Sequence, residues 1–341
     1  MAKSKWFIFV TSACAFCLVL PSFGQQNVNV VAQVGNLKIT ESDLEQQESG
    51  KLLQARYQYY LAKSSALDDM IDQKLLEQKA KQENLTVQQL IDRDINSKVV
   101  EPTEDQLKIY YEGLETDQPY EVMRPKIVEK IHTIRVNKVR TAYLKTLREQ
   151  AGVIIQLAPP SAEINLAEAN VMGNKDAPVM LVEFADYECP YCQKVAPEIP
   201  KLMAEFGNKL AVSFKDFPLP MHSHAEKAAE ATRCAADQGK YWEYHNILFN
   251  SKQLDVDQLK EHAKALHLDE AKFSACLDSG STAAAVQKDR QEGVALGLSG
   301  TPSFFINGHY FSGALDYETL RENINRELTQ QTHQVAMAAS H

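Results

Sequence analysis

The sequence predicts a mostly α-helical N-terminal region followed by an α/β fold that contains a helical insertion. The chain has 341 residues, more than the roughly 100–200 usual for one domain. Pro159 and Pro160 mark a linker, and after them helical stripes give way to short apolar runs typical of buried strands. We therefore expect a helical domain over residues 25–158, an α/β domain over residues 159–330, and a disordered tail over residues 331–341.

The first 24 residues are typical of a secretory signal peptide. Two lysines precede an apolar run from Trp6 to Leu20 that is short for a transmembrane helix, and Ser22 and Gly24 place small residues at a cleavage site. Cys14 and Cys17 would leave with this segment. A retained membrane anchor is the alternative interpretation.

The composition is that of an ordinary globular protein, with 44% hydrophobic and 24% charged residues. The formal net charge of −9 argues against nucleic acid as a partner. Four cysteines follow the signal peptide, and an even number in an exported protein suggests two pairs. They are Cys189, Cys192, Cys234 and Cys276.

The N-terminal region reads first as a short strand or extended arm from Val28 to Ile39, and Thr40–Asp43 then provides a helix start. Capping boxes open two further helices, and Pro125 to Gln150 forms the last one. The boxes are Thr86 with Gln89 and Thr103 with Gln106, and the apolar stripe comprises Leu67, Met70, Ile71, Leu75 and Leu76.

The C-terminal region shows the alternation of an α/β fold. Val179–Phe184 and Leu210–Phe214 are apolar runs that predict buried strands, and a long helical stretch runs from His224 to about Gly297. Ser303–Ile306 and Tyr310–Ser312 predict a hairpin across Asn307-Gly308.

The chemistry is expected at Cys189-Pro190-Tyr191-Cys192, between the first of these strands and a helix. A cysteine at a helix N-terminus faces unpaired N–H groups and the positive end of the helix dipole, so its thiolate is favoured. Cys189 is thus the attacking sulfur, and Cys192, one turn along, resolves the mixed disulfide. Pro190 fixes φ at the helix start. Half of a zinc site or a structural bridge are the alternatives.

The stretch from Val182 to Cys192 resembles the DsbA-like branch of the thioredoxin superfamily. The similarity runs from about Asn174 to Ile324 and includes Phe214–Leu219, Ala225–Phe249 and Gly300-Thr301-Pro302. It implies a thioredoxin fold with a helical insertion and a disulfide oxidoreductase or isomerase of the periplasm, with neither cofactor nor metal. Pro190-Tyr191 departs from the Pro-His of the best-known strong oxidant, so the oxidising strength stays open.

The resemblance also implies roles for residues outside the motif. Thr301-Pro302 matches the cis-proline loop that faces the active-site sulfurs, and Glu183 matches a buried acid that relays protons to Cys192. Lys215 is expected either to pair with Glu183 or to be a surface lysine. Cys234 and Cys276 are expected to form a structural disulfide, with a second redox pair as the alternative. His222, His224 and His245 are expected to be capping or surface residues rather than ligands.

Residues from about Val30 to Ile155 resemble the helical N-terminal region of SurA-type periplasmic chaperones. The resemblance rests on Val34–Thr40, Leu67–Lys79 and Glu101–Glu104. No parvulin domain follows, so proline isomerase activity is not implied. The resemblance implies a surface for holding unfolded chains or for pairing two copies, and Tyr57, Tyr59 and Tyr60 fit either an interface or a core.

The function expected from these observations is the formation or isomerisation of disulfides in unfolded or misfolded exported proteins. We expect a homodimer whose cysteine pair is recycled by a membrane redox partner. A holdase chaperone with accessory thiols and a copper-handling thioredoxin-like protein are the alternatives.

Overall fold

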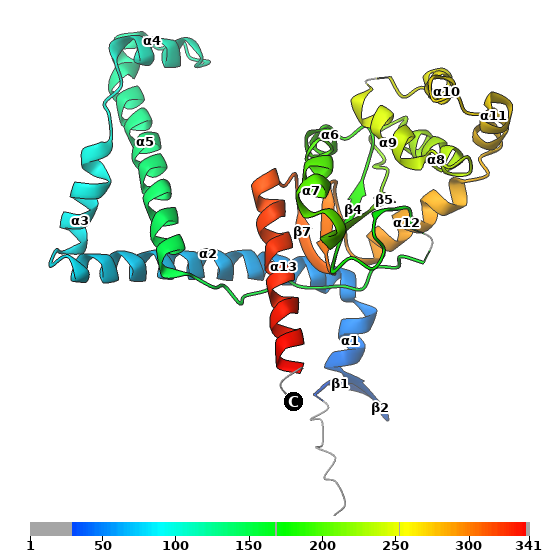
Figure 1. Cartoon of the computed structure of the whole chain (residues 1–341), viewed down its shortest axis with the longest axis horizontal. Coiled ribbons are helices and arrows are strands. Elements are labelled where there is room, and N and C mark those ends of the chain that lie inside the picture. Colours follow the sequence, from blue (N-terminus) through cyan, green and yellow to red (C-terminus); the bar gives the residue numbers. More distant parts are fainter. Residues whose placement is uncertain (1–28, 168, 252, 339–341) are drawn as a thin grey trace, which may run out of the picture. The chain divides into compact units, whose positions relative to one another are not determined.

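The computed structural model describes residues 29–167, 169–251 and 253–338 (Figure 1). The chain divides into two compact units between Glu48 and Ser49. The expected signal peptide lies outside the described residues. Among the described helices, none combines the length and the apolar character that crossing a bilayer requires.

The first unit is a β-hairpin followed by a short helix. Strand β1 (Val30–Val34) pairs antiparallel with β2 (Leu37–Thr40), and α1 covers Glu41–Gln47. The predicted single strand is a hairpin because Gly35 adopts φ +62°, the left-handed conformation that a tight turn requires. The predicted helix start is confirmed, since Thr40 and Asp43 cap α1 reciprocally.

The second unit begins with four helices, which we call the arm. They are α2 (Ser49–Gln82), α3 (Val87–Asp94), α4 (Glu104–Glu112) and α5 (Tyr120–Ala151), with a 3₁₀ turn at Asn96–Lys98. The capping boxes predicted at Thr86 and Thr103 are confirmed. Helix α5 begins five residues before the predicted start, so that Pro125 lies inside it.

Two small apolar clusters hold the arm together. Leu75, Leu76 and Ala80 of α2 pack with α3 and α5, while Leu107 of α4 packs with Ile127 and Ile131 of α5. Met70, which we expected in the buried stripe, is 63% exposed. The stripe therefore begins to be buried only where α3 and α5 cover α2.

A five-stranded sheet forms the centre of the α/β fold (Figure 1), and its strand order is β3-β5-β4-β6-β7. Strands β4 and β5 pair in parallel, and the other neighbouring strands pair antiparallel. The strands are β3 (Val171–Gly173), β4 (Val179–Ala185), β5 (Leu210–Asp216), β6 (Ser303–Ile306) and β7 (His309–Ser312). This thioredoxin-like sheet was expected except for β3, whose three residues are too few to show a strand pattern.

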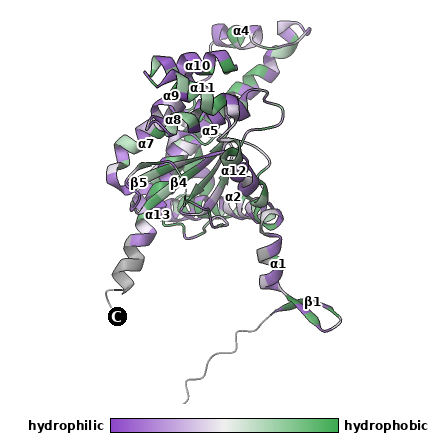
Figure 2. Cartoon of the chain, turned by 90° about the vertical axis from the view of Figure 1, so that its right-hand side faces the viewer, coloured by the Kyte–Doolittle hydropathy of each residue, from purple (hydrophilic) through white to green (hydrophobic). Residues whose placement is uncertain are grey.

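Helices cover both faces of this sheet. One face packs against α7 (Glu198–Phe206) and α13 (Tyr317–Ala338), and the other includes contacts from the start of α2. The central strands are hydrophobic between more polar helices (Figure 2). The insertion comprises α8 (Ala225–Ala236), α9 (Tyr241–Asn250), α10 (Val256–Ala265), α11 (Glu270–Ser279) and α12 (Ala283–Ala295). Helix α6 (Pro190–Val195) begins inside the cysteine motif, directly after Cys189.

The C-terminal segment departs from the prediction. A disordered tail was expected over residues 331–341, but α13 continues to Ala338. The segment lacks apolar periodicity, yet it contains no Gly or Pro and carries helix-favouring Ala, Met and Gln, so the helix can continue through it.

The arm is fixed to the sheet through the first turns of α2. Leu53 and Tyr57 are buried against Phe305 and Tyr310, and the Tyr57 hydroxyl accepts a hydrogen bond from the Ser312 backbone N–H at 3.2 Å. Core packing is therefore the role of Tyr57. Tyr60 stacks on Tyr57, whereas Tyr59 is 70% exposed.

Two glycines permit this attachment. A Cβ on Gly50 would lie 2.2 Å from the Ala295 carbonyl oxygen, and a Cβ on Gly297, whose φ is +73°, would lie 2.1 Å from the Gly50 oxygen. Backbone therefore touches backbone where α2 meets the end of α12.

We predict that Gly50→Ala destabilises the protein by about 2 kcal/mol, because an extra methyl in this contact forces the backbones apart. Denaturant unfolding measures the effect. Gly113→Ala is the control, since its Cβ would meet nothing closer than 3.6 Å. Equal stability of Gly50→Ala and the wild-type protein would contradict the packing described.

Candidate active site

Cys189 lies at the N-terminus of α6, as the sequence predicted. It is the N-cap residue, Pro190 occupies the first helical position, and the Gln193 N–H donates to the Cys189 carbonyl at 3.0 Å. Cys189 and Cys192 are free thiols, and both are buried. Tyr191, between them, is 57% exposed. The motif thus presents an aromatic ring to solvent beside a nearly covered sulfur.

The surroundings of Cys189 favour its thiolate. Its pKa is lowered to about 5, first by the Cys192 thiol as a hydrogen-bond donor, then by Thr301 and the backbone N–H groups of Cys192 and Tyr191. The Thr301 hydroxyl is buried and has no other partner among the described residues. It is therefore available to donate to the thiolate.

Cys192 and Glu183 have the opposite character. Burial first, then the hydrogen bond to Cys189 and the charge of Glu183, raise the pKa of the Cys192 thiol far above its ordinary value. Burial, with a smaller contribution from the Cys189 charge, raises the pKa of Glu183 to about 8. One carboxyl oxygen of Glu183 has no hydrogen-bond partner among the described residues. The site therefore pairs one acidic thiol with two groups that hold their protons.

The loop before β6 faces the cysteines. The Thr301-Pro302 peptide bond is cis, as the resemblance implied. The Cys189 thiol donates to the Thr301 carbonyl oxygen at 3.4 Å, although 112 positions separate the two residues. The loop is thus brought to the attacking sulfur by the pairing of β4 with β6.

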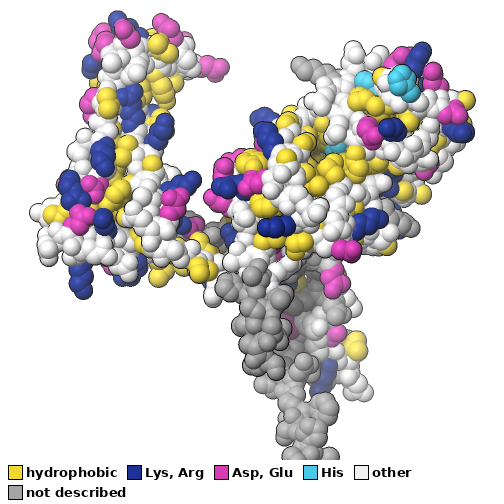
Figure 3. Space-filling view, in the orientation of Figure 1, with side chains coloured by type: hydrophobic (Ala, Val, Ile, Leu, Met, Phe, Trp, Pro, Cys, Tyr) yellow, Lys and Arg dark blue, Asp and Glu magenta, His cyan; other side chains and the backbone are white. Residues whose placement is uncertain are grey.

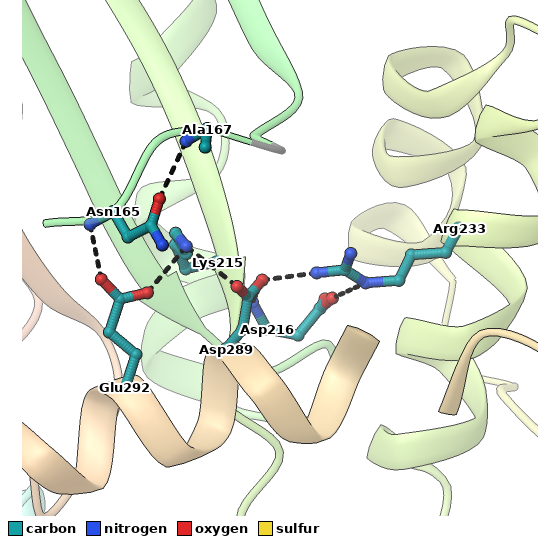
Figure 4. Close-up of polar contacts among 7 residues, drawn as sticks. All are labelled: Asn165, Ala167, Lys215, Asp216, Arg233, Asp289 and Glu292. Atoms are coloured by element: carbon teal, nitrogen blue, oxygen red, sulfur yellow. Dashed lines mark hydrogen bonds and ion pairs between the residues drawn. The ribbon is translucent and has the colours of Figure 1, made fainter. Parts of the chain in front are cut away.

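The expected pairing of Lys215 with Glu183 is wrong. The Lys215 ammonium instead contacts Asp289 at 2.9 Å and Glu292 at 2.8 Å, both on α12 (Figure 4). Glu183 aligns with Phe214, so the neighbouring Lys215 points to the opposite face of the sheet. Nor is Lys215 a surface lysine, because it is 6% exposed.

Lys215 belongs to a buried ionic network with Asp216, Arg233, Asp289 and Glu292. Arg233 of α8 contacts Asp216 at 2.6 Å and also reaches Asp289, while the Asn165 backbone N–H donates to Glu292 (Figure 4). Burial is the largest cause that raises the pKa of Asp216, to about 6. The network joins β5, α8 and α12, so its role is to hold the insertion on the sheet.

Asp186 is a site residue that the sequence analysis missed. Its buried carboxylate accepts from the backbone N–H groups of Glu188 and Leu219, each at 2.8 Å, and contacts His222 Nδ1 at 2.7 Å. Its carbonyl accepts from the Cys189 N–H at 3.1 Å. Asp186 therefore fastens the residues before Cys189 to the loop after β5. Its position three residues before Cys189 was the available signal.

The three histidines have distinct surroundings. His224 precedes α8 and contacts the Glu188 carboxylate at 2.9 Å, and His222 contacts Asp186. His245 is neither a cap nor a surface residue, because it is 8% exposed and contacts the Tyr187 hydroxyl at 3.0 Å. Burial lowers the pKa of His245 to about 3, so it is neutral. His245 is buried because α9 packs its aromatic side chains against the loop that carries Tyr187. No spacing in the sequence indicated this burial.

Cys234 and Cys276 form a disulfide between α8 and α11. Their Cα atoms lie 5.9 Å apart. Cys234 is fully buried in the cluster that also holds Cys189 and Cys192. The pairing agrees with the structural bridge that the resemblance implied.

Family models match the two halves of the chain separately. Residues 166–326 match a thioredoxin family, and residues 2–101 match the family described as the SurA-like N-terminal domain. Both resemblances noted in the sequence are therefore confirmed, and the C-terminal domain has a thioredoxin-like fold.

The chain is also similar to several known proteins. It is 35% identical over 153 residues to the Na(+)/H(+) antiporter NhaA 1 of Salinispora arenicola, a match that covers 44% of this chain and 23% of the relative. The chain thus spans about a quarter of the length of such curated relatives.

Two solved structures are similar to part of the chain. A thioredoxin-like oxidoreductase from Silicibacter pomeroyi is 25% identical with TM-score 0.45, covering 48% of this chain and 94% of its own. BdbD from Bacillus subtilis, in its oxidised form, is 26% identical with TM-score 0.46, covering 50% and 99%.

We predict that alkylation of Cys189 by iodoacetamide stays fast from neutral pH down to about 6 and falls to half its plateau near pH 5, because the thiolate is the nucleophile. The stability that the ionised thiol gives the reduced form is fully present above about pH 8.5 and is lost as the pH falls towards 5. Mass spectrometry of the alkylated protein measures the rate. Cys192→Ala should move the midpoint upward, and a wild-type midpoint near 8.5 would contradict the assignment.

We predict that Asp186→Ala destabilises the reduced protein by about 2 kcal/mol, because it leaves two backbone N–H groups and His222 without their acceptor. Denaturant unfolding measures the loss. Asp176→Ala, at an exposed position, is the control and should change stability by less than about 0.5 kcal/mol. Similar stabilities for both variants would show that Asp186 does not fasten the two loops.

Proposed function

We propose that this protein is a periplasmic thiol-disulfide oxidoreductase that forms or isomerises disulfides in exported proteins. The observation that carries the proposal is the Cys189 sulfur, whose pKa of about 5 stands beside a buried Cys192 that retains its proton. A good thiolate leaving group next to a resolving thiol is what disulfide exchange requires.

In the oxidising direction, a client thiolate attacks Cys189 in the Cys189–Cys192 disulfide. The enzyme S–S bond breaks, a mixed disulfide forms, and Cys192 leaves as a thiolate that takes up a proton. A second client thiolate then attacks the client sulfur of the mixed disulfide and releases Cys189 as a thiolate. Two electrons pass from client to enzyme, so a membrane redox partner must reoxidise the pair. The reaction needs no cofactor.

In isomerisation the reduced Cys189 attacks a client disulfide and forms a mixed disulfide. When the client does not rearrange, Cys192 attacks this mixed disulfide, releases the client sulfur as a thiolate and closes the Cys189–Cys192 disulfide. Cys192 must lose its proton for that step. Glu183 is suited to exchange this proton, because its pKa of about 8 lies near the working pH and its charge acts on Cys192. The cis-proline loop of Thr301 and Pro302 would receive the client chain opposite Cys189.

The arm supports a second function, the holding of unfolded clients or the pairing of two copies into a homodimer. Among the described residues, several large apolar side chains of the arm are mostly exposed. They include Val100, Ile109 and Val122, at 74%, 68% and 55%. Because single exposed apolar residues are common on protein surfaces, the match of residues 2–101 to the SurA-like N-terminal domain is the observation that supports this second function.

We predict that Cys189→Ser abolishes insulin reduction and the reactivation of scrambled ribonuclease, because no thiolate remains to attack. Cys192→Ser should instead accumulate mixed disulfides with clients, visible on non-reducing gels, because the resolving thiol is missing. A double Cys234→Ala, Cys276→Ala variant, assayed where it remains folded, serves as the control and should retain both activities. Undiminished activity of Cys189→Ser would refute the proposed function.

A further inference from the structure

Helix α5 is strongly basic in an acidic protein. Between Arg124 and Arg148 it carries eight Lys or Arg residues and a single acidic residue, Glu129, whereas the whole chain has a formal net charge of −9. The eight are Arg124, Lys126, Lys130, Arg135, Lys138, Arg140, Lys145 and Arg148.

Three of the eight are engaged within the arm. Arg124 pairs with Glu104 at 2.8 Å, Arg148 pairs with Asp68 and Asp72, and Arg135 donates to the Val100 carbonyl and the Gln106 side chain. These arginines join α5 to α2, to α4 and to the segment before α4. Their charge is accounted for by the folding of the arm.

The other five are exposed and have no side-chain partner among the described residues. Lys126, Lys130 and Lys138 follow one row of the helix at spacings of four and eight positions, and Lys145 lies two turns beyond Lys138, so we call these four lysines the cationic face. Arg140 lies about 160° from Lys138 around the helix and does not belong to this face. Exposed Val122 and Ile134 lie on the same helix. Figure 3 shows basic and hydrophobic side chains next to one another over this part of the arm. The acidic balance of the chain already provides charge for solubility, so the cationic face calls for another role.

We propose that the cationic face binds acidic, unfolded segments of client polypeptides. This inference rests on the proposed function and names the class of client segment that the arm selects. From Lys126 to Lys145 the helix rises about 28 Å, which matches about nine residues of extended chain. Such a segment with several Asp or Glu side chains pairs with the lysines, and its aliphatic side chains contact Val122 and Ile134.

The distribution of apolar residues favours a polypeptide over a lipid surface. At 100° per residue, Val122 and Ile134 lie about 120° apart around the helix, with lysines between them. A helix that lies in a membrane interface needs one continuous apolar face to insert. The cationic face has none, so its charges are suited to a partner that brings separate carboxylates.

The test is fluorescence anisotropy of the full-length protein with two labelled disordered peptides. One contains Asp, Glu, Leu and Gly, and the other replaces the acids with Lys. We expect binding of the acidic peptide only, weakened by salt because exposed charge pairs are screened. The triple variant K126E/K130E/K138E should bind about tenfold more weakly, and K126Q/K130Q/K138Q should lie between.

The matched control is K175E/K209E/K264E, which makes the same change in net charge at exposed lysines of the thioredoxin-like domain. It should bind within about twofold of the wild-type protein. Equal weakening by both triple variants, or none by the arm variant, would overturn the inference. So would unchanged peptide binding together with lost binding to phosphatidylglycerol vesicles, which would identify a membrane surface. Insulin reduction measured in parallel reports on the thiol chemistry alone, so the two proposals fail in different assays.

Discussion

The pairing of β4 with neighbours on both sides is the constraint on which the rest of the structure depends. Parallel pairing with β5 and antiparallel pairing with β6 fix which residues of β4 share a face. The same pairing delivers the chain to α6 at Cys189 and brings Thr301 to that sulfur from 112 positions away. A slip of one residue would exchange Glu183 for its neighbours and remove the buried acid from beneath the cysteines.

This arrangement separates two kinds of buried charge. Glu183 lies on the face towards the sulfurs and keeps an oxygen without a partner, while Lys215, aligned one position further along β5, lies on the other face and is neutralised by α12. A buried ionisable group without a partner can exchange a proton, whereas a buried charge that is paired links the elements that carry the pair. The sheet thus places the unpaired acid on the face of the sulfurs and the paired lysine on the face that α12 covers.

The arm depends on the sheet in a different way. Its inner turns share a core with β6 and β7 through Leu53 and Tyr57, and its outer helices rely on two small clusters of their own. Those clusters leave much of the arm's apolar and basic surface uncovered. On the proposed function, a surface that binds clients in the same chain as the thiolate would raise the effective concentration of client sulfur at Cys189.

The sequence by itself determined the features that depend on neighbouring residues: the capping boxes, the hairpin at Asn307-Gly308, and a cysteine at a helix start with its partner one turn away. Resemblance to known families added the cis proline and the Cys234–Cys276 bridge. Only the tertiary structure decided that Asp186 fastens two loops, that His245 is buried and neutral, and that Lys215 turns away from Glu183. The reason is physical, since strand register and the burial of a side chain depend on segments far apart in the chain, which no local pattern specifies.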